Sequence, residues 1–240
     1  MSLPKLNDIP LYDITIPSIN LKTRFRPYLV KEEKVLLIAL ESEDEKQITQ
    51  VIIDLIKACI SEPIDEKKLT TFDMEYLFTQ IRAKSVGETA KVILLCQSDT
   101  CQTSNEVSVP IAKAGVDLAD GLDKNIDLTD DISIEMKYLS YYDILNAKED
   151  KKDITESEII FNNIILSMVS ISANDERILF KDEGYEATIE FVNNLTMSQF
   201  GKLRDFVINT PRVKLKIDYK CKGCGHDNTV MLAGLHDFFQ

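Results

Sequence analysis

The sequence contains no tryptophan, only two histidines and few glycines, and these shortages exclude several kinds of site. Among its 240 residues there are 8 glycines, and none of them builds the phosphate-binding loop that follows a strand in nucleotide-binding proteins. His226 and His236 lie in no HExxH or GxSxG motif and beside no nucleophile in a recognisable pattern. The sequence therefore predicts that the protein is not an enzyme and has no catalytic residues.

Long hydrophobic runs and an excess of positive charge are also missing. No apolar run approaches the roughly 20 residues that a membrane-spanning helix needs, and no signal peptide is recognisable. The chain carries 28 Lys and Arg against 40 Asp and Glu, a net charge of −12, which disfavours binding to nucleic acid or to an anionic membrane. We therefore expect a protein that is made in the cytoplasm and has no membrane partner.

Four of the five cysteines form two distant pairs. Cys96 and Cys101 lie in VILLCQSDTCQTSNEVSVPI, and Cys221 and Cys224 lie in RVKLKIDYKCKGCGHDNTVML. A β-type run leads into each pair and another follows it, which predicts two hairpins with cysteines at their tips. Two such tips facing each other would give the tetrahedral four-thiolate site of structural zinc. We thus predict a zinc site formed by Cys96, Cys101, Cys221 and Cys224.

Other interpretations of the cysteines stay open. Cys221 and Cys224 have the spacing of a thioredoxin-like redox pair, although their flanks resemble a hairpin and not a βαβ unit. Two local disulfides would suit a secreted protein, and the four thiols could also remain without metal. Gly223 and Gly225 favour a metal-binding turn, because such a turn needs a close backbone approach and often a positive φ. His226 could replace one sulfur, but a solvated loop position is the simpler interpretation.

The chain divides into five segments. Residues 1–27 carry prolines between short apolar pairs, which predicts an extended N-terminal arm on its own domain or on a neighbouring subunit. Residues 28–88 are expected to be helical, and residues 89–112 to form the first cysteine hairpin. The remaining segments are an acidic loop, strand and helical insertion over 113–211, and the second cysteine hairpin with a docked C-terminus over 212–240. The expected class is α+β, with a zinc-ribbon-like pair of β-hairpins and a large, mainly helical body.

Periodicity predicts individual elements within these segments. Thr70-Thr71-Phe72-Asp73 resembles a capping box, and the apolar residues that follow it have the spacing of one helix face. The run VLLIALES fits a buried strand or a buried helix equally well. Residues 156–171 are apolar enough to predict one largely buried helix. Because the two cysteine pairs are far apart, a joint site would make zinc a staple that closes a very long loop.

Positive charge gathers before and within the second cysteine pair. The residues between Lys202 and Lys222 include more basic than acidic side chains: Arg204, Arg212, Lys214, Lys216 and Lys220 against Asp205 and Asp218. A basic zinc ribbon can bind nucleic acid through its phosphates, but no aromatic ladder for base stacking accompanies these charges. An acidic protein surface is therefore the simpler partner.

Four stretches between about residue 26 and the C-terminus occur together in one order. They are RPYLVKEEKVLLIALES, TTFDMEYLFTQIRAKSVGE, IEMKYLS and YKCKGCGHDNTVMLAGLHDFF. With these stretches, the chain resembles the baseplate hub subunits of T-even-type (contractile-tailed) bacteriophages, and its four paired cysteines match the cysteine pairs of that family.

The resemblance implies a structural protein of the virion, located in the tail baseplate as part of a hetero-oligomeric assembly. Its expected partners are other hub, spike and wedge proteins of the baseplate, and it brings no catalytic residues. Two alternatives remain: a hub assembly chaperone that is absent from the mature virion, and a nucleic-acid-binding zinc-ribbon protein.

Overall fold

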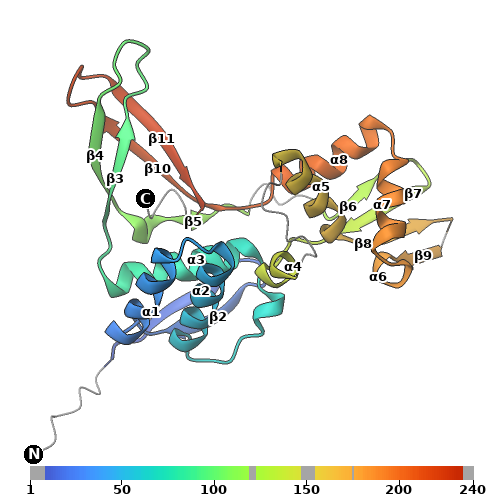
Figure 1. Cartoon of the computed structure of the whole chain (residues 1–240), viewed down its shortest axis with the longest axis horizontal. Coiled ribbons are helices and arrows are strands. Elements are labelled where there is room, and N and C mark those ends of the chain that lie inside the picture. Colours follow the sequence, from blue (N-terminus) through green and yellow to red (C-terminus); the bar gives the residue numbers. More distant parts are fainter. Residues whose placement is uncertain (1–8, 119–122, 147–154, 175, 235–240) are drawn as a thin grey trace, which may run out of the picture. The chain divides into compact units, whose positions relative to one another are not determined.

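The computed structural model describes residues 9–118, 123–146, 155–174 and 176–234, and the chain forms two compact units. Unit 1 consists of Met1–Leu118 and Arg212–Gln240, and unit 2 of Ala119–Pro211. Both units contain helices and strands (Figure 1), which confirms the α+β class. None of the helices in the described ranges is long and apolar enough to cross a membrane.

The N-terminal segment forms a hairpin where the sequence predicts an extended arm. Strand β1 (Tyr12–Ile16) pairs antiparallel with β2 (Leu21–Phe25), and Pro17 lies in the turn, where no strand hydrogen bond needs its missing N–H. The backbone N–H and hydroxyl of Ser18 both donate to the carboxylate of Asp73, far away in the sequence. Residues 12–25 are thus extended chain folded into a hairpin on its own unit, which is not the single arm that the sequence predicts, and residues 1–8 lie outside the described residues.

Three helices follow this hairpin in unit 1: α1 (Val30–Glu41), α2 (Glu45–Cys59) and, after a 3-10 helix (Glu66–Lys68), α3 (Thr71–Ser85). The run VLLIALES covers the second half of α1 and its C-cap Ser42, so the helical alternative is the one adopted. Its predicted burial is wrong, because Leu36 and Ala39 are buried but the other apolar side chains of the run are exposed. Helix α3 begins as predicted, because Thr70 caps the Asp73 N–H while the Asp73 carboxylate accepts from the Thr70 N–H. The predicted apolar face of α3 is buried: Met74, Leu77, Phe78 and Ile81.

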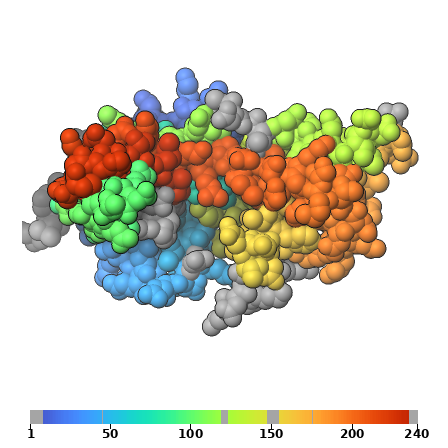
Figure 2. Space-filling view, turned by 90° about the horizontal axis from the view of Figure 1, so that it is seen from above, coloured from blue at the N-terminus to red at the C-terminus, as the bar shows by residue number. Residues whose placement is uncertain are grey.

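Two cysteine hairpins complete unit 1. Strand β3 (Ala90–Leu95) pairs with β4 (Ser104–Val109), and β10 (Val213–Lys220) pairs with β11 (Asp227–Ala233). After a 3-10 helix (Ile111–Lys113), the short strand β5 (Gly115–Val116) pairs with the start of β10. The two hairpins lie side by side (Figures 1 and 2). Their facing sides share an apolar cluster that includes Val92, Val109, Ile217 and Leu232.

Unit 2 contains a four-stranded antiparallel sheet of order β6-β7-β8-β9. Its strands are β6 (Asn125–Asp127), β7 (Ile132–Met136), β8 (Met168–Ala173) and β9 (Glu176–Leu179). Its helices are α4 (Tyr141–Leu145), α5 (Glu156–Ser167), α6 (Phe180–Glu183), α7 (Tyr185–Asn193) and α8 (Met197–Ile208). A four-stranded sheet therefore stands where the sequence predicts a single strand, and it lies in a unit that has more residues in helices than in strands.

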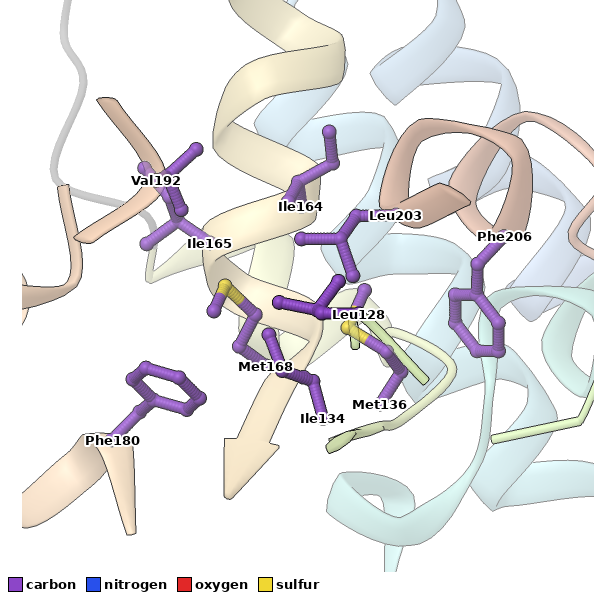
Figure 3. Close-up of a cluster of buried hydrophobic side chains, with 10 residues drawn as sticks. All are labelled: Leu128, Ile134, Met136, Ile164, Ile165, Met168, Phe180, Val192, Leu203 and Phe206. Atoms are coloured by element: carbon purple, nitrogen blue, oxygen red, sulfur yellow. The ribbon is translucent and has the colours of Figure 1, made fainter. Parts of the chain in front are cut away.

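The apolar run over residues 156–171 is divided between two elements. Helix α5 ends at Ser167, and Met168 begins β8, so the prediction of one helix is wrong for the last residues of the run. Figure 3 shows the core that this arrangement builds from α5, α8 and the sheet, in which Ile134, Ile164 and Leu203 are completely buried. A run that is apolar on every face serves equally as a buried helix or a buried strand.

Candidate metal centre

The tips of the two cysteine hairpins bring four sulfurs together. The Sγ atoms of Cys96, Cys101, Cys221 and Cys224 all lie within 4.8 Å of one another. The Cys96–Cys224 sulfur distance is 3.6 Å and the Cys101–Cys221 distance is 3.8 Å, so each close contact joins one hairpin to the other. A tetrahedral zinc ion with bonds of about 2.3 Å separates its sulfur ligands by about 3.8 Å. The arrangement is therefore close to the one that such an ion requires.

Backbone hydrogen bonds shape the loop of the second hairpin. The Cys221 N–H donates to the His226 carbonyl at 2.8 Å, and the Gly225 N–H donates to the Cys221 carbonyl at 3.0 Å. Gly225 has φ +75°, which confirms the expected positive φ, a conformation that side chains on Cβ disfavour. The side chain of His226 is exposed and does not belong to the sulfur cluster, in agreement with a solvated loop position.

Gly223 is required by a contact between the hairpins. A Cβ atom at this position would collide with the side chain of Thr103, whose Cβ is 3.1 Å away. The sequence predicts a close backbone approach at Gly223 but attributes it to the metal. The structure shows that the neighbour is the loop of the first hairpin, so this glycine allows the two tips to meet.

The local environment gives the thiols of the second hairpin different pKa values. Backbone N–H groups of Cys224 and Gly223, together with the Asn105 amide, lower the pKa of Cys221 to about 6. The backbone at His226 favours the Cys224 thiolate, but burial and the three neighbouring sulfurs raise the pKa of Cys224 to about 12. Four adjacent thiolates repel one another unless a cation is present, and a metal ion would supply that charge.

Two buried asparagines complete the site, and the sequence analysis missed them. Asn105 Oδ1 accepts a hydrogen bond from the Lys222 N–H at 2.8 Å, and Asn228 Oδ1 accepts one from the Gln97 N–H at 2.7 Å. Each asparagine therefore binds the loop of the opposite hairpin. A signal was present in the sequence, because an asparagine stands four positions after the second cysteine in both hairpins.

The donor set indicates the chemistry that the site can support. Four cysteine sulfurs satisfy a tetrahedral ion and leave no position for a reactive water, as in structural zinc sites. All five cysteines are free thiols, and both pairs lie on hairpins and not in a βαβ unit. The geometry thus fits a structural metal ion better than it fits either the disulfide or the redox interpretation.

Comparison with known proteins places this chain among the baseplate proteins of bacteriophages. It belongs to the family described as T4 bacteriophage base plate protein, which matches residues 9–240. The chain is also 24% identical over 216 residues to the baseplate hub assembly protein gp26 of Enterobacteria phage T4, covering 90% of this chain and 91% of that protein. No solved structure matches. The resemblance seen in the sequence is therefore confirmed.

Proposed function

We propose that the chain is a structural subunit of the tail baseplate hub, located in the virion, and that it acts by binding neighbouring proteins and not by catalysis. Its partners are other baseplate proteins, those of the hub, spike and wedges. Membership of the baseplate family supports this function. The observation on the molecule that carries it is an apolar surface on helix α1.

Helix α1 exposes an unusual amount of apolar side chain. Its buried residues are Leu36 and Ala39. Five large apolar side chains of the same helix are between 48% and 80% exposed: Val30, Val35, Leu37, Ile38 and Leu40. We call these five residues the α1 surface. Isolated exposed apolar residues are normal in a monomer, whereas a large exposed apolar group is typical of a surface that binds a partner.

A groove beside the α1 surface adds to this argument. It has a volume of about 370 Å³ and is lined by residues of α1 and α2: Lys31, Glu32, Val35, Val51, Asp54 and Leu55. Apolar side chains therefore lie beside charged ones of both signs. Protein interfaces typically combine an apolar centre with a polar rim, and this groove offers both.

The test is incorporation into baseplates. We expect Leu37→Glu and Ile38→Glu, combined in one chain, to prevent incorporation while the chain stays folded, because substitutions at exposed positions usually change stability by only about 0.5 kcal/mol. Met197→Glu is the matched control, since it places the same charge at an exposed apolar position of another helix, α8. Complementation of a phage that lacks the wild-type chain, followed by mass spectrometry of its tails, gives the readout. Normal incorporation of the double variant would contradict the role of the α1 surface.

A second candidate is a hub assembly protein that leaves before the particle matures. The name of the T4 relative, a baseplate hub assembly protein, favours it. Mass spectrometry of purified virions and of assembling tails separates the two candidates. A subunit persists in the virion in a fixed ratio to other hub proteins, whereas an assembly factor is found only in the intermediates.

We also propose that the four cysteine sulfurs hold one zinc ion per chain, and that the ion is structural. The support is the all-sulfur donor set and the inter-hairpin sulfur distances of 3.6 and 3.8 Å. Elemental analysis of the purified chain should give one zinc per molecule. An absence of stoichiometric zinc would contradict this proposal and leave the baseplate proposal intact.

A further inference from the structure

The two cysteine hairpins repeat one set of polar contacts. In the first, the Cys96 N–H donates to the Thr103 carbonyl, and the Asn105 side-chain amide donates to the same carbonyl at 2.9 Å. In the second, the Cys221 N–H donates to the His226 carbonyl, which also accepts from the Asn228 amide at 2.9 Å. Asn105 and Asn228 are therefore equivalent residues of two matching half-sites.

Each of these asparagines also reaches the other half-site. Asn105 Oδ1 accepts from the N–H of Lys222, the residue after Cys221. Asn228 Oδ1 accepts from the N–H of Gln97, the residue after Cys96. Both asparagines are almost completely buried, at 1% and 2% exposed, and a hydrogen bond in such a position has no water to replace it. In each hairpin, the residue that follows the first cysteine is thus held by the asparagine of the opposite hairpin.

The two asparagines differ in their contacts to sulfur. Asn105 Nδ2 also lies 3.6 Å from Cys221 Sγ and donates to that sulfur. A hydrogen bond to a metal-bound thiolate withdraws negative charge from the sulfur and orients it. Asn105 is therefore placed to affect both the position and the electronic properties of a ligand, whereas the contacts described for Asn228 are to backbone groups.

We propose that Asn105 and Asn228 are positioning residues of the zinc site, each of which holds the ligand loop of the opposite hairpin in the geometry that the ion requires. This inference rests on the proposed zinc ion. Groups that orient metal ligands typically change metal affinity by about 10- to 100-fold when they are removed. We therefore expect a loss of that size from Asn105→Ala and from Asn228→Ala.

The experiment uses the full chain and two readouts. Zinc affinity is measured by competition with a coloured chelator, and the ligand field by absorption of the cobalt(II)-substituted chain. Asn105→Ala and Asn228→Ala should each weaken zinc, and Asn105→Ala should also shift the sulfur-to-cobalt charge-transfer band because it removes the hydrogen bond to Cys221. The matched control is Asn125→Ala, an exposed asparagine of unit 2, which should leave both readouts unchanged.

An uncharged variant of similar shape separates the hydrogen bonds from packing. Asn228→Leu has nearly the same shape, but it loses both the acceptor for Gln97 and the donor to His226. We expect it to weaken zinc as Asn228→Ala does. A leucine variant with wild-type zinc affinity would overturn the role assigned to these contacts, and this comparison remains decisive if Asn105→Ala does not fold.

Failure of this inference is distinguishable from failure of the zinc proposal. If the wild-type chain binds zinc and cobalt tightly while both alanine variants keep wild-type affinity and spectra, the asparagines are not positioning residues and the zinc site stands. If the wild-type chain binds neither ion, the zinc proposal fails and this inference fails with it.

Discussion

The cysteine hairpins of unit 1 and the sheet of unit 2 are both antiparallel, but different forces hold them. In unit 2, helices and strands share one apolar core, with Ile134, Ile164 and Leu203 at its centre. In the hairpins, an apolar cluster covers the facing strands, but thiols and asparagine amides join the tips. The difference teaches that the sheet is stabilised by its own side chains, whereas the tips are joined by polar contacts and by the metal ion that we propose.

Loss of the metal should give the largest effect, and it should be confined to the hairpins. A ligand present at about 1,000 times its dissociation constant stabilises the folded state by about 4 kcal/mol, so Cys224→Ser or removal of zinc by a chelator should strongly destabilise the tips. Hydrogen exchange of the full chain should show loss of protection in β3–β4 and β10–β11. Equal loss in β7 and β8 of unit 2 would break the comparison.

A cavity in the core of unit 2 should destabilise unit 2 and leave the cysteine hairpins protected. Ile164→Ala removes a completely buried side chain, and such substitutions cost about 2–5 kcal/mol. Thermal unfolding and hydrogen exchange should locate the loss in unit 2, while the zinc content stays at the wild-type level. A simultaneous loss of zinc would show that the two units do not depend on separate interactions.

A steric clash between the two hairpin tips should cause an intermediate loss of stability. Gly223→Ala pushes a Cβ atom against Thr103, and overpacking of this kind costs about 1–3 kcal/mol. Thr103→Gly in the same chain should restore part of the stability, because it removes the colliding side chain. Gly201→Ala is the matched control: a Cβ there meets no atom within 4 Å, and alanine within helix α8 should stabilise the chain by about 0.5–1 kcal/mol.

Removal of an ion pair on the surface of the unit 2 sheet should cause the smallest loss of stability. Arg177 pairs with Glu135, which also accepts from the Ser170 hydroxyl. The hydrogen bond from the Ser170 hydroxyl lowers the pKa of Glu135 most, and Arg177 lowers it further. Together they outweigh desolvation, which raises it. Arg177→Ala should cost at most about 1 kcal/mol near neutral pH, as exposed ion pairs do.

The pH dependence of that small effect has a definite sign. A carboxyl group whose pKa is lowered in the folded state contributes stability above its unfolded pKa and loses it as the pH falls through the folded pKa. Unfolding midpoints of wild type and Arg177→Ala should therefore differ at neutral pH and converge in acid. A difference that grows in acid would show that Arg177 acts through packing and not through Glu135.

The sequence predicts the elements whose signals are local. Thr70 and Asp73 form the predicted capping box at the start of α3, and the paired cysteines with Gly225 indicate the second loop. The convergence of the two pairs follows from chemistry, because four thiols suggest one shared ion. Occupancy of the site by zinc stays a prediction.

The sequence does not predict the elements that depend on distant partners. The turn between β1 and β2 is tied to Asp73 by Ser18, 55 positions away, and the prolines of this segment give no sign of that partner. Met168 belongs to β8 because it pairs opposite Met136 of β7, and an apolar run by itself shows no such partner. Asn105 and Asn228 resemble ordinary loop residues until the opposite hairpin supplies the N–H groups that they bind.

The pairing of β5 with β10 bears on how the chain tolerates changes in the length of unit 2, which is inserted between these strands. Val116 lies opposite Val213, and Gly115 opposite Lys214, so the chain leaves unit 1 and returns to it at neighbouring positions. Insertions tolerate exchange best where their ends are close together. Relatives could therefore enlarge, shrink or replace the whole of unit 2 during evolution, with no change to the scaffold that carries it.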